Sequence, residues 1–237
     1  YKNSTKRFTC SKSFIPKIKE RGICSENIEF WPQYAEEFYQ PAEKRDLADI
    51  PDNGRFQIMF AGNIGYAQGL ELLVEAAEVL SKEGVQICFT IIGEGSYKEE
   101  LVSKIAESGL EAYFWFIERK PAEQIPSYFA FADALLVILS KSEVFSITLP
   151  SKTQSCMACG KPLLVSADGE IQDLVSGANA GLVSSAGDVG KLVENIKRML
   201  LMDEEELRQM GQNAFSYAKK NFNKEKLMGR LDEVFCK

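Results

Sequence analysis

Apolar runs and segments with a helical period alternate along most of the chain. Short continuous apolar runs predict strands, and longer segments with apolar residues three or four positions apart predict helices. The predicted strands cover residues 56–61, 87–92, 113–116, 134–139, 162–166 and 180–183. The predicted helices cover residues 70–80, 97–108, 122–130, 151–158, 171–176, 189–201, 204–221 and 224–235.

These predicted strands are apolar along their length and do not alternate between apolar and polar residues. Such strands belong to parallel sheets that helices cover on both faces. With right-handed crossovers, the pattern predicts an α/β fold, a doubly wound, Rossmann-like parallel sheet. Ligands of this fold bind beyond the carboxyl ends of the strands. The candidate functional loops are therefore residues 62–69, 93–96, 117–121, 140–151 and 167–170.

The first fifty residues have a different pattern. They predict a short helix at 14–19 and a short strand at 28–31, followed by a charged stretch with Pro32, Pro41 and Pro51. We interpret residues 1–50 as the end of an N-terminal domain and a linker, and residues 51–237 as the following domain. Because the sequence starts with Tyr1, we expect it to be part of a longer protein.

Composition narrows the possible functions. The 237 residues are 45% hydrophobic and 26% charged, as in globular proteins, and no apolar run reaches the ~18–20 residues of a membrane span. A net charge of −6 argues against a nucleic-acid partner. The absence of histidine excludes Ser-His-Asp triads, Cys-His dyads and histidine-ligated zinc. We expect no metal and no cofactor, and any catalytic base here must be a carboxylate or a lysine.

The six cysteines do not suggest a disulfide framework, and reduced thiols indicate the cytoplasm. Cys88 lies in a predicted strand, as a small core residue would. Cys156 and Cys159 form a CxxC spacing, but no second pair or histidine completes a metal site. We interpret them as small residues packed on a helix. The remaining cysteines are Cys10, Cys24 and Cys236.

Two loops contain glycines that could approach an anion. Gly62-Asn63-Ile64-Gly65 separates a predicted strand from a helix, whose start offers free N–H groups and a positive dipole end. It matches neither GxGxxG nor a P-loop, so a tight turn explains it equally well. In the second loop, 93–96, Ser96 suits a helix cap, and the structural explanation is favoured.

The segment 143–155 leads from a strand through a polar loop into a helix. We expect Ser151 or Thr148 to cap that helix. Its free N–H groups, its dipole and the Lys152 ammonium would favour a diphosphate, with Glu143 across the crevice as an acceptor for sugar hydroxyls. A capped helix with a solvated lysine is the alternative, and the sequence leaves both open.

In this order, the loops resemble the C-terminal, donor-binding half of GT-B glycosyltransferases of the retaining GT4 family. The resemblance covers nearly the whole chain, from about 11 to 235. It rests on the combination of "FQIMFAGNIGYAQGLELLVEAAEVL", "FADALLVIL" and "PSKTQSCMACGKPLLVSADGE", preceded by the linker-like "NIEFWPQYAEEFYQP". The Gly-Asn-Ile-Gly and Pro-Ser-Lys segments are similar to those of the bacterial surface-polysaccharide subgroup.

The resemblance implies roles for individual residues. Glu143 takes the place of the first family glutamate, which contacts the donor sugar or its phosphates. Ser155 replaces the second, which holds ribose, so that either Ser155 or Gln154 takes over that contact or the ribose is held differently. Asn63 stands in the loop where relatives have an arginine and lysine pair. The implied donor-binding residues are Gly62, Asn63, Gly65, Arg119, Lys120, Ser151, Lys152, Gln154 and Ser155.

The resemblance implies transfer of a sugar from a nucleotide diphosphate sugar, a UDP-sugar first of all, to a glycan or lipid-linked acceptor. That acceptor would be held by the missing N-terminal domain, so we expect this chain alone to be inactive. The full-length enzyme would work in the cytoplasm, with room for peripheral association at the inner face of the membrane. The alternatives are a nucleotide-sugar 2-epimerase on the same scaffold and a non-enzymatic Rossmann-like binding module.

Overall fold

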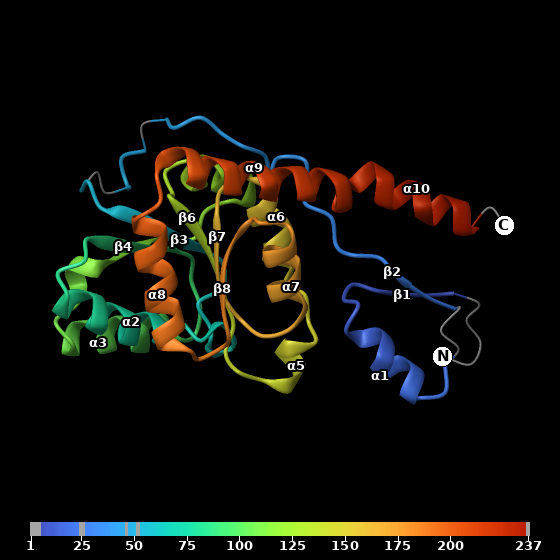
Figure 1. Ribbon diagram of the computed structural model, residues 1–237, viewed down its shortest axis with the longest axis horizontal. Coiled ribbons are helices and arrows are strands. Elements are labelled where there is room, and N and C mark those ends of the chain that lie inside the picture. The colour runs from blue at the N-terminus through green and yellow to red at the C-terminus, as the bar shows by residue number, and fades with distance from the viewer. Residues whose placement is uncertain (1–5, 24–26, 46, 51–52, 236–237) are drawn as a thin grey trace.

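The computed structural model describes residues 6–23, 27–45, 47–50 and 53–235 (Figure 1). Pro51, Cys24 and Cys236 lie outside the described residues. The described part forms a broad α/β body and a narrower lobe, which carries both ends of the chain (Figure 1). In the described residues, no helix has the length and apolar character needed to cross a membrane.

The body is built on a six-stranded parallel sheet with the order β5-β4-β3-β6-β7-β8. The chain therefore winds outward from β3 in one direction and then from β6 in the other, which confirms the predicted doubly wound, Rossmann-like fold. The strand bounds are β3 Phe56–Ala61, β4 Ile87–Ile92, β5 Phe114–Ile117, β6 Ala134–Ile138, β7 Leu163–Ser166 and β8 Gly181–Ser184.

Successive residues of a strand point to opposite faces, so the sheet has a core on each side. In β3, Ile58 and Phe60 pack in one core and Met59 in the other. Helices α2, α3 and α8 cover the first face, and α4, α6, α7 and α9 cover the second. Their bounds are α2 Glu71–Lys82, α3 Lys98–Glu107, α4 Ile125–Phe129, α6 Ser151–Ala158, α7 Glu170–Gly177, α8 Val189–Leu200 and α9 Glu204–Asn221.

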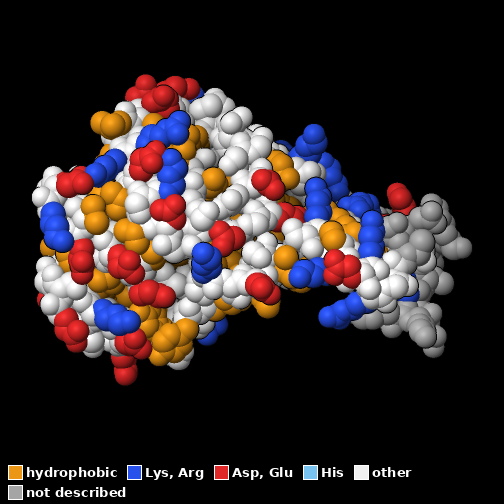
Figure 2. Space-filling view, turned by 60° about the horizontal axis from the view of Figure 1, so that its bottom comes forward, with side chains coloured by type: hydrophobic (Ala, Val, Ile, Leu, Met, Phe, Trp, Pro, Cys, Tyr) orange, Lys and Arg blue, Asp and Glu red, His pale blue; other side chains and the backbone are white. Residues whose placement is uncertain are grey.

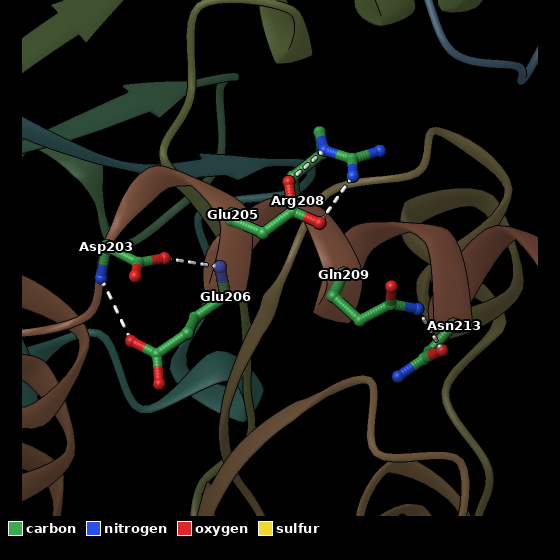
Figure 3. Close-up of polar contacts among 6 residues, drawn as sticks. All are labelled: Asp203, Glu205, Glu206, Arg208, Gln209 and Asn213. Carbon is green, nitrogen blue, oxygen red and sulfur yellow. Dashed lines mark hydrogen bonds and ion pairs between the residues drawn. The ribbon is translucent and has the colours of Figure 1, made fainter.

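Helix α9 begins with a reciprocal cap (Figure 3). The Asp203 carboxylate accepts from the Glu206 backbone N–H at 2.8 Å, and the Asp203 N–H donates to the Glu206 carboxylate at 3.0 Å. One turn on, Arg208 pairs with Glu205. These contacts fix the start of the helix at the residue that the sequence predicts.

The lobe combines both ends of the chain. Strands β1 (Arg7–Thr9) and β2 (Ile28–Phe30) pair in parallel beside α1 (Phe14–Glu20), and α10 (Lys224–Phe235) extends from α9 to reach them (Figure 1). The Trp31 indole N–H donates to the carbonyl oxygen of Leu227 in α10 at 3.0 Å. Figure 2 shows Lys and Arg side chains gathered over this narrower part.

Two elements differ from the sequence prediction. Strand β1 was not predicted, because its three residues, RFT, are too few to show a period. A short helix, α5 (Glu143–Ser146), replaces part of the predicted loop after β6. The Ser142 hydroxyl starts it by accepting from the Val144 N–H at 3.3 Å.

Candidate functional site

A cavity of about 500 Å³, which we call the carboxyl-end cavity, opens beyond the ends of β3 and β4 and against the start of α6. Its volume falls within the range of about 300–1,000 Å³ typical of small-molecule sites. Strand order reverses between β3 and β6, and doubly wound domains bind ligands at this place. The lining residues are Tyr34, Glu36, Tyr39, Ala61, Gly62, Asn63, Ile92, Gly93, Glu94, Arg119, Lys120, Ala122, Ile125, Phe129, Ser151, Lys152, Ser155 and Cys156.

Two glycines let the loops after β3 and β4 meet backbone to backbone. A Cβ atom on Gly93 would lie 1.9 Å from the carbonyl oxygen of Gly62, so no side chain fits there. A Cβ atom on Gly62 would lie 3.2 Å from the Nζ atom of Lys152. The bare backbone at Gly62 therefore gives the Lys152 ammonium room at the cavity wall.

The start of α6 has no side-chain cap. Pro150 occupies the N-cap position, and the Thr148 hydroxyl donates instead to the carbonyl oxygen of Val144 at 2.7 Å. The expectation that Ser151 or Thr148 caps this helix is therefore wrong. The free N–H groups at the start of α6 and the positive end of its dipole remain directed toward the cavity side, where an anion would be stabilised.

Lys152 is the most unusual charged group of the cavity. Its Nζ atom is buried and has no hydrogen-bond partner among the described residues. It lies 3.9 Å from the centroid of the Phe60 ring, which gives it a cation–π contact. Burial lowers the pKa of Lys152 from its ordinary value of 10.5 to about 8. A buried, unpaired ammonium is costly unless an anion joins it.

Seven of the ten residues that the sequence analysis nominated line the carboxyl-end cavity. They come from the loops after β3 and β5 and from helix α6, which are far apart in the sequence. They are Gly62, Asn63, Arg119, Lys120, Ser151, Lys152 and Ser155.

The other three nominated residues lie elsewhere. Gly65 is buried, and its N–H donates to the Gln68 side-chain oxygen at 3.2 Å, which stabilises the turn before α2. Gln154 is 1% exposed, and its amide nitrogen faces the carbonyl oxygens of Ser151 and Pro150 at 2.7 and 2.9 Å. Glu143 is exposed at the start of α5 and does not line the cavity.

The two neighbouring cations of the loop after β5 have different surroundings. The Lys120 ammonium lies 2.6 Å from the Asp49 carboxylate, which also accepts from the Tyr128 hydroxyl at 2.9 Å. Asp49 raises the pKa of Lys120 through this hydrogen bond. Arg119 is exposed and has no ion-pair partner among the described residues. Of the two, Arg119 has the charge that is free for a ligand.

Sequence reasoning missed one whole wall of the cavity. Tyr34, Glu36 and Tyr39 come from the segment before the body, which the sequence indicated only as a linker. No local pattern signals their contribution, since it depends on how this segment crosses the sheet end. Cys156 could have been found, because it lies four residues after Lys152 on one helical face.

The described residues contain no group of three or more histidine, cysteine or acidic residues that could hold a metal ion. Cys156 and Cys159 are free and buried. Burial raises the pKa of the Cys156 thiol to about 12. Both thiols are therefore protonated near neutral pH, as expected for packed residues.

Comparison with known proteins identifies the relatives of this chain. A family model described as "Glycosyl transferases group 1" matches residues 43–217. The chain is 28% identical over 232 residues to WcaI of Escherichia coli (strain K12), a glycosyl transferase whose name refers to colanic acid biosynthesis. It is also 28% identical over 163 residues to the 2-deoxystreptamine glucosyltransferase of Streptomyces kanamyceticus. These matches cover 93% and 68% of the chain, but only 54% and 41% of the relatives, so the chain spans about half their length.

Solved structures share the fold. The crystal structure of Anabaena Alr3699/HepE in complex with UDP superposes with a TM-score of 0.82 at 18% identity, covering 98% of this chain and 64% of that one. The C-terminal domain of LpcC, a glycosyl transferase group 1 family protein from Francisella tularensis, has a TM-score of 0.63 at 20% identity. That match covers 80% of this chain and 98% of the LpcC domain.

Proposed function

The chain belongs to the group 1 glycosyltransferases, and we propose that its carboxyl-end cavity binds the nucleotide diphosphate sugar that donates the sugar. The full-length enzyme would transfer this sugar, with retention of configuration, to a glycan or lipid-linked acceptor. Residues 51–237 form the donor-binding domain in this proposal, and residues 1–50 belong to the end of the acceptor-binding domain and the linker.

One observation carries the proposal. The uncapped start of α6 and the buried, unpartnered Lys152 ammonium face the same cavity. Helix N–H groups, the helix dipole and an ammonium with no acceptor together form a site for an anion. A diphosphate supplies the oxygen atoms that these groups lack.

Other lining residues of the cavity are suited to a nucleoside. Ile92, Ile125 and Phe129 provide apolar surface in the cavity, and Arg119 adds a positive charge to its lining. Three solved structures of Anabaena Alr3699/HepE share this fold. One is a complex with UDP, one with UDP and glucose, and one with UDP-glucose. These complexes support uridine as the nucleoside of the donor.

The chemistry proposed for this half is stabilisation of the leaving group. As the bond from the sugar to the diphosphate breaks, negative charge grows on the phosphate beside α6 and Lys152. The carbon that the phosphate leaves becomes oxocarbenium-like. We assign Glu143, on α5 between β6 and α6, to the donor sugar, where its carboxylate would accept hydroxyl hydrogen bonds. No base from this half is required if the leaving phosphate takes up the proton.

Free thiols at Cys88, Cys156 and Cys159 favour a reducing compartment. The proposal therefore places the full-length enzyme in the cytoplasm, where it would meet a lipid-linked acceptor at the inner face of the membrane.

Calorimetry of this chain with UDP, UMP, GDP and ADP tests donor binding. We expect UDP to bind more tightly than UMP, because only UDP places a second phosphate at α6. We also expect UDP to bind more tightly than the two purine nucleotides. If none of the nucleoside diphosphates binds, the proposal is wrong and a binding module with another ligand is favoured.

Glu143→Gln in the full-length enzyme tests the assignment of the sugar. We expect sugar transfer to fall while UDP affinity is unchanged. Equal losses of transfer and UDP affinity in a folded variant would assign Glu143 a structural role. Sugar transfer by the 237-residue chain alone would contradict an acceptor site in the other domain.

A further inference from the structure

The aromatic ring of Phe60 lies against the Lys152 ammonium, although Phe60 itself does not line the carboxyl-end cavity. Phe60 belongs to β3 and is 1% exposed, in the core that α2, α3 and α8 cover. Helix α6, which carries Lys152, covers the opposite face of the sheet. The Lys152 side chain therefore reaches across the carboxyl end of the sheet, and its Nζ atom lies 3.9 Å from the centroid of the ring.

A glycine leaves room for this contact. A Cβ atom on Gly62 would lie 3.6 Å from the Cζ atom of the Phe60 ring and 3.2 Å from the Nζ atom of Lys152. The tip of the ring and the ammonium thus meet at the bare backbone of Gly62, which lines the cavity. The ammonium is buried there, beside the space in which the proposed diphosphate would bind.

The acidic residues that line the cavity do not pair with Lys152, because they have other partners. The Glu94 carboxylate lies 2.6 Å from the Lys98 ammonium. The Glu36 carboxylate lies 3.9 Å from the Lys224 ammonium. The Lys152 Nζ atom has no hydrogen-bond partner among the described residues, so no carboxylate of that part of the chain offsets the cost of burying its charge.

The other charged and titratable groups near Lys152 do not favour its charge either. Arg119 and Lys120 line the same cavity as cations, which disfavour a further positive charge. Cys156 lies one turn along α6, and its buried thiol keeps its proton near neutral pH. Within the described part of the chain, the Phe60 ring is therefore the contact that favours the charged form of Lys152.

An aromatic ring differs from a carboxylate in what it leaves free. The negative face of the ring attracts the cation but accepts no conventional hydrogen bond, and a lysine ammonium has three N–H donors. A carboxylate in the same place would also offset the burial, but it would repel an arriving diphosphate and compete with it for those donors. The ring therefore stabilises the ammonium and leaves its donors for an anionic ligand.

We propose that Phe60 is a positioning residue, whose ring holds the Lys152 ammonium charged and in place at the cavity wall before the donor diphosphate binds. The inference rests on the proposed donor site. It concerns a buried residue that touches no ligand and acts only through Lys152.

Fluorinated phenylalanines in place of Phe60 test this inference, because each added fluorine makes the ring face less negative while the shape of the ring changes little. In calorimetry above about pH 8, the monofluoro, difluoro and trifluoro analogues should lower UDP affinity step by step. The pH above which UDP affinity decreases should also move downward, because a less stabilised ammonium loses its proton at lower pH. Phe60→Leu, which removes the ring face, should lower UDP affinity above about pH 8 by about 2–30-fold.

Phe89 provides the matched control. It is also 1% exposed and packs in the same core, but its ring lies against the Phe114 ring, with centroids 5.4 Å apart. Fluorination of Phe89 should change neither UDP affinity nor its pH profile, and thermal melting should show all fluorinated proteins folded.

Lys152→Met separates a role through Lys152 from a general role in packing. In this variant, fluorination of Phe60 should leave UDP affinity unchanged. If fluorination of Phe60 has no effect in the unaltered chain, or an equal effect in Lys152→Met, the inference is wrong and the donor site stands. If the unaltered chain does not bind UDP, the proposed function itself fails.

Discussion

A cavity lies at each end of the parallel sheet, and the larger one is not the candidate site. The carboxyl-end cavity has a volume of about 500 Å³, and a second cavity of about 1110 Å³ lies beside the amino ends of the strands. We call the second the amino-end cavity. It is lined by Lys44, Leu47, Ala48, Ile50, Asn53, Gly54, Arg55, Phe56, Gln57, Gln86, Phe131, Asp133, Met199, Leu200, Met202, Glu204 and Leu207.

Polar groups of the amino-end cavity bind one another. The Gln57 N–H donates to the Asp133 carboxylate at 2.7 Å, and the Asp133 N–H donates to the Gln57 carbonyl at 2.9 Å. The Gln57 side-chain amide donates to Asn53 at 2.9 Å. In the carboxyl-end cavity, by contrast, the Lys152 ammonium has no partner among the described residues. Buried polar groups normally find partners, so an unpaired one indicates a ligand more directly than volume does.

Lys152→Met should have the largest effect, and in opposite directions on binding and stability. UDP affinity should fall about 10–100-fold, or about 1–3 kcal/mol, because a charged hydrogen-bond partner is lost. At pH 7 the free energy of unfolding without ligand should rise by about 1–3 kcal/mol, because a buried unpaired ammonium is removed. Calorimetry and urea denaturation measure the two effects.

Lys191→Met is the control for Lys152→Met, because Lys191 pairs with Glu194 on the surface of α8. It should change neither quantity by more than about 0.5 kcal/mol. A joint loss of affinity and stability in Lys152→Met would mean that Lys152 is part of the packing and not kept for an anion.

Asp133→Ala, at the amino-end cavity, should lower the stability of the protein and leave UDP affinity unchanged. Without its carboxylate, the Gln57 N–H loses its acceptor, and the free energy of unfolding should fall by about 1–3 kcal/mol. UDP affinity should not change, because Asp133 lines the amino-end cavity and not the carboxyl-end cavity. Asp133→Asn keeps an acceptor and should recover part of the stability. A loss of UDP affinity in folded Asp133→Ala would remove the distinction between the two cavities.

The order of helices and strands in the body could be predicted from the sequence, because continuous apolar runs and helical periods are local signals. The chemistry of α6 was predictable only in part. Lys152 was nominated from the Pro-Ser-Lys sequence, but whether its ammonium is solvated or buried depends on Phe60 and Gly62, which lie far away in the sequence. Likewise, no sequence pattern distinguishes Ser155, which faces the cavity, from the adjacent Gln154, which faces the start of its own helix.

The protonation of Lys152 predicts a pH dependence that only the carboxyl-end cavity should show. The pKa of Lys152 is about 8 in the folded protein, against an ordinary value of 10.5. Bound diphosphate favours the ammonium, so UDP binding should take up a proton above about pH 8. UDP affinity should therefore decrease above this pH, with a slope approaching tenfold per pH unit.

Stability without ligand should respond to pH in the other direction. Between about pH 8 and 10.5, Lys152 keeps its proton in the unfolded chain but has lost it in the folded protein. The contribution of Lys152 to the free energy of unfolding therefore rises with pH in this range. Calorimetry and urea denaturation at several pH values measure both trends relative to Lys152→Met, which should show neither. Identical pH profiles for the two proteins would contradict the assignment to Lys152.

The smallest effect should separate Arg119 from Lys120, two adjacent cations that line the same cavity. The Lys120 charge is already matched by Asp49 at 2.6 Å, whereas Arg119 has no ion-pair partner among the described residues. Arg119→Met should weaken UDP binding by about 0.5–1 kcal/mol at low salt, and less at high salt, because the charge is exposed. Lys120→Met should weaken it less, because the Lys120 charge already serves Asp49 and not the ligand. Any loss that it shows should come from repulsion by the freed Asp49 carboxylate, so Lys120→Met combined with Asp49→Asn should bring affinity back near that of the unaltered chain. Calorimetry at two salt concentrations measures this series. Equal losses for Arg119→Met and Lys120→Met would show that pairing within the protein does not decide which groups of this cavity serve the ligand.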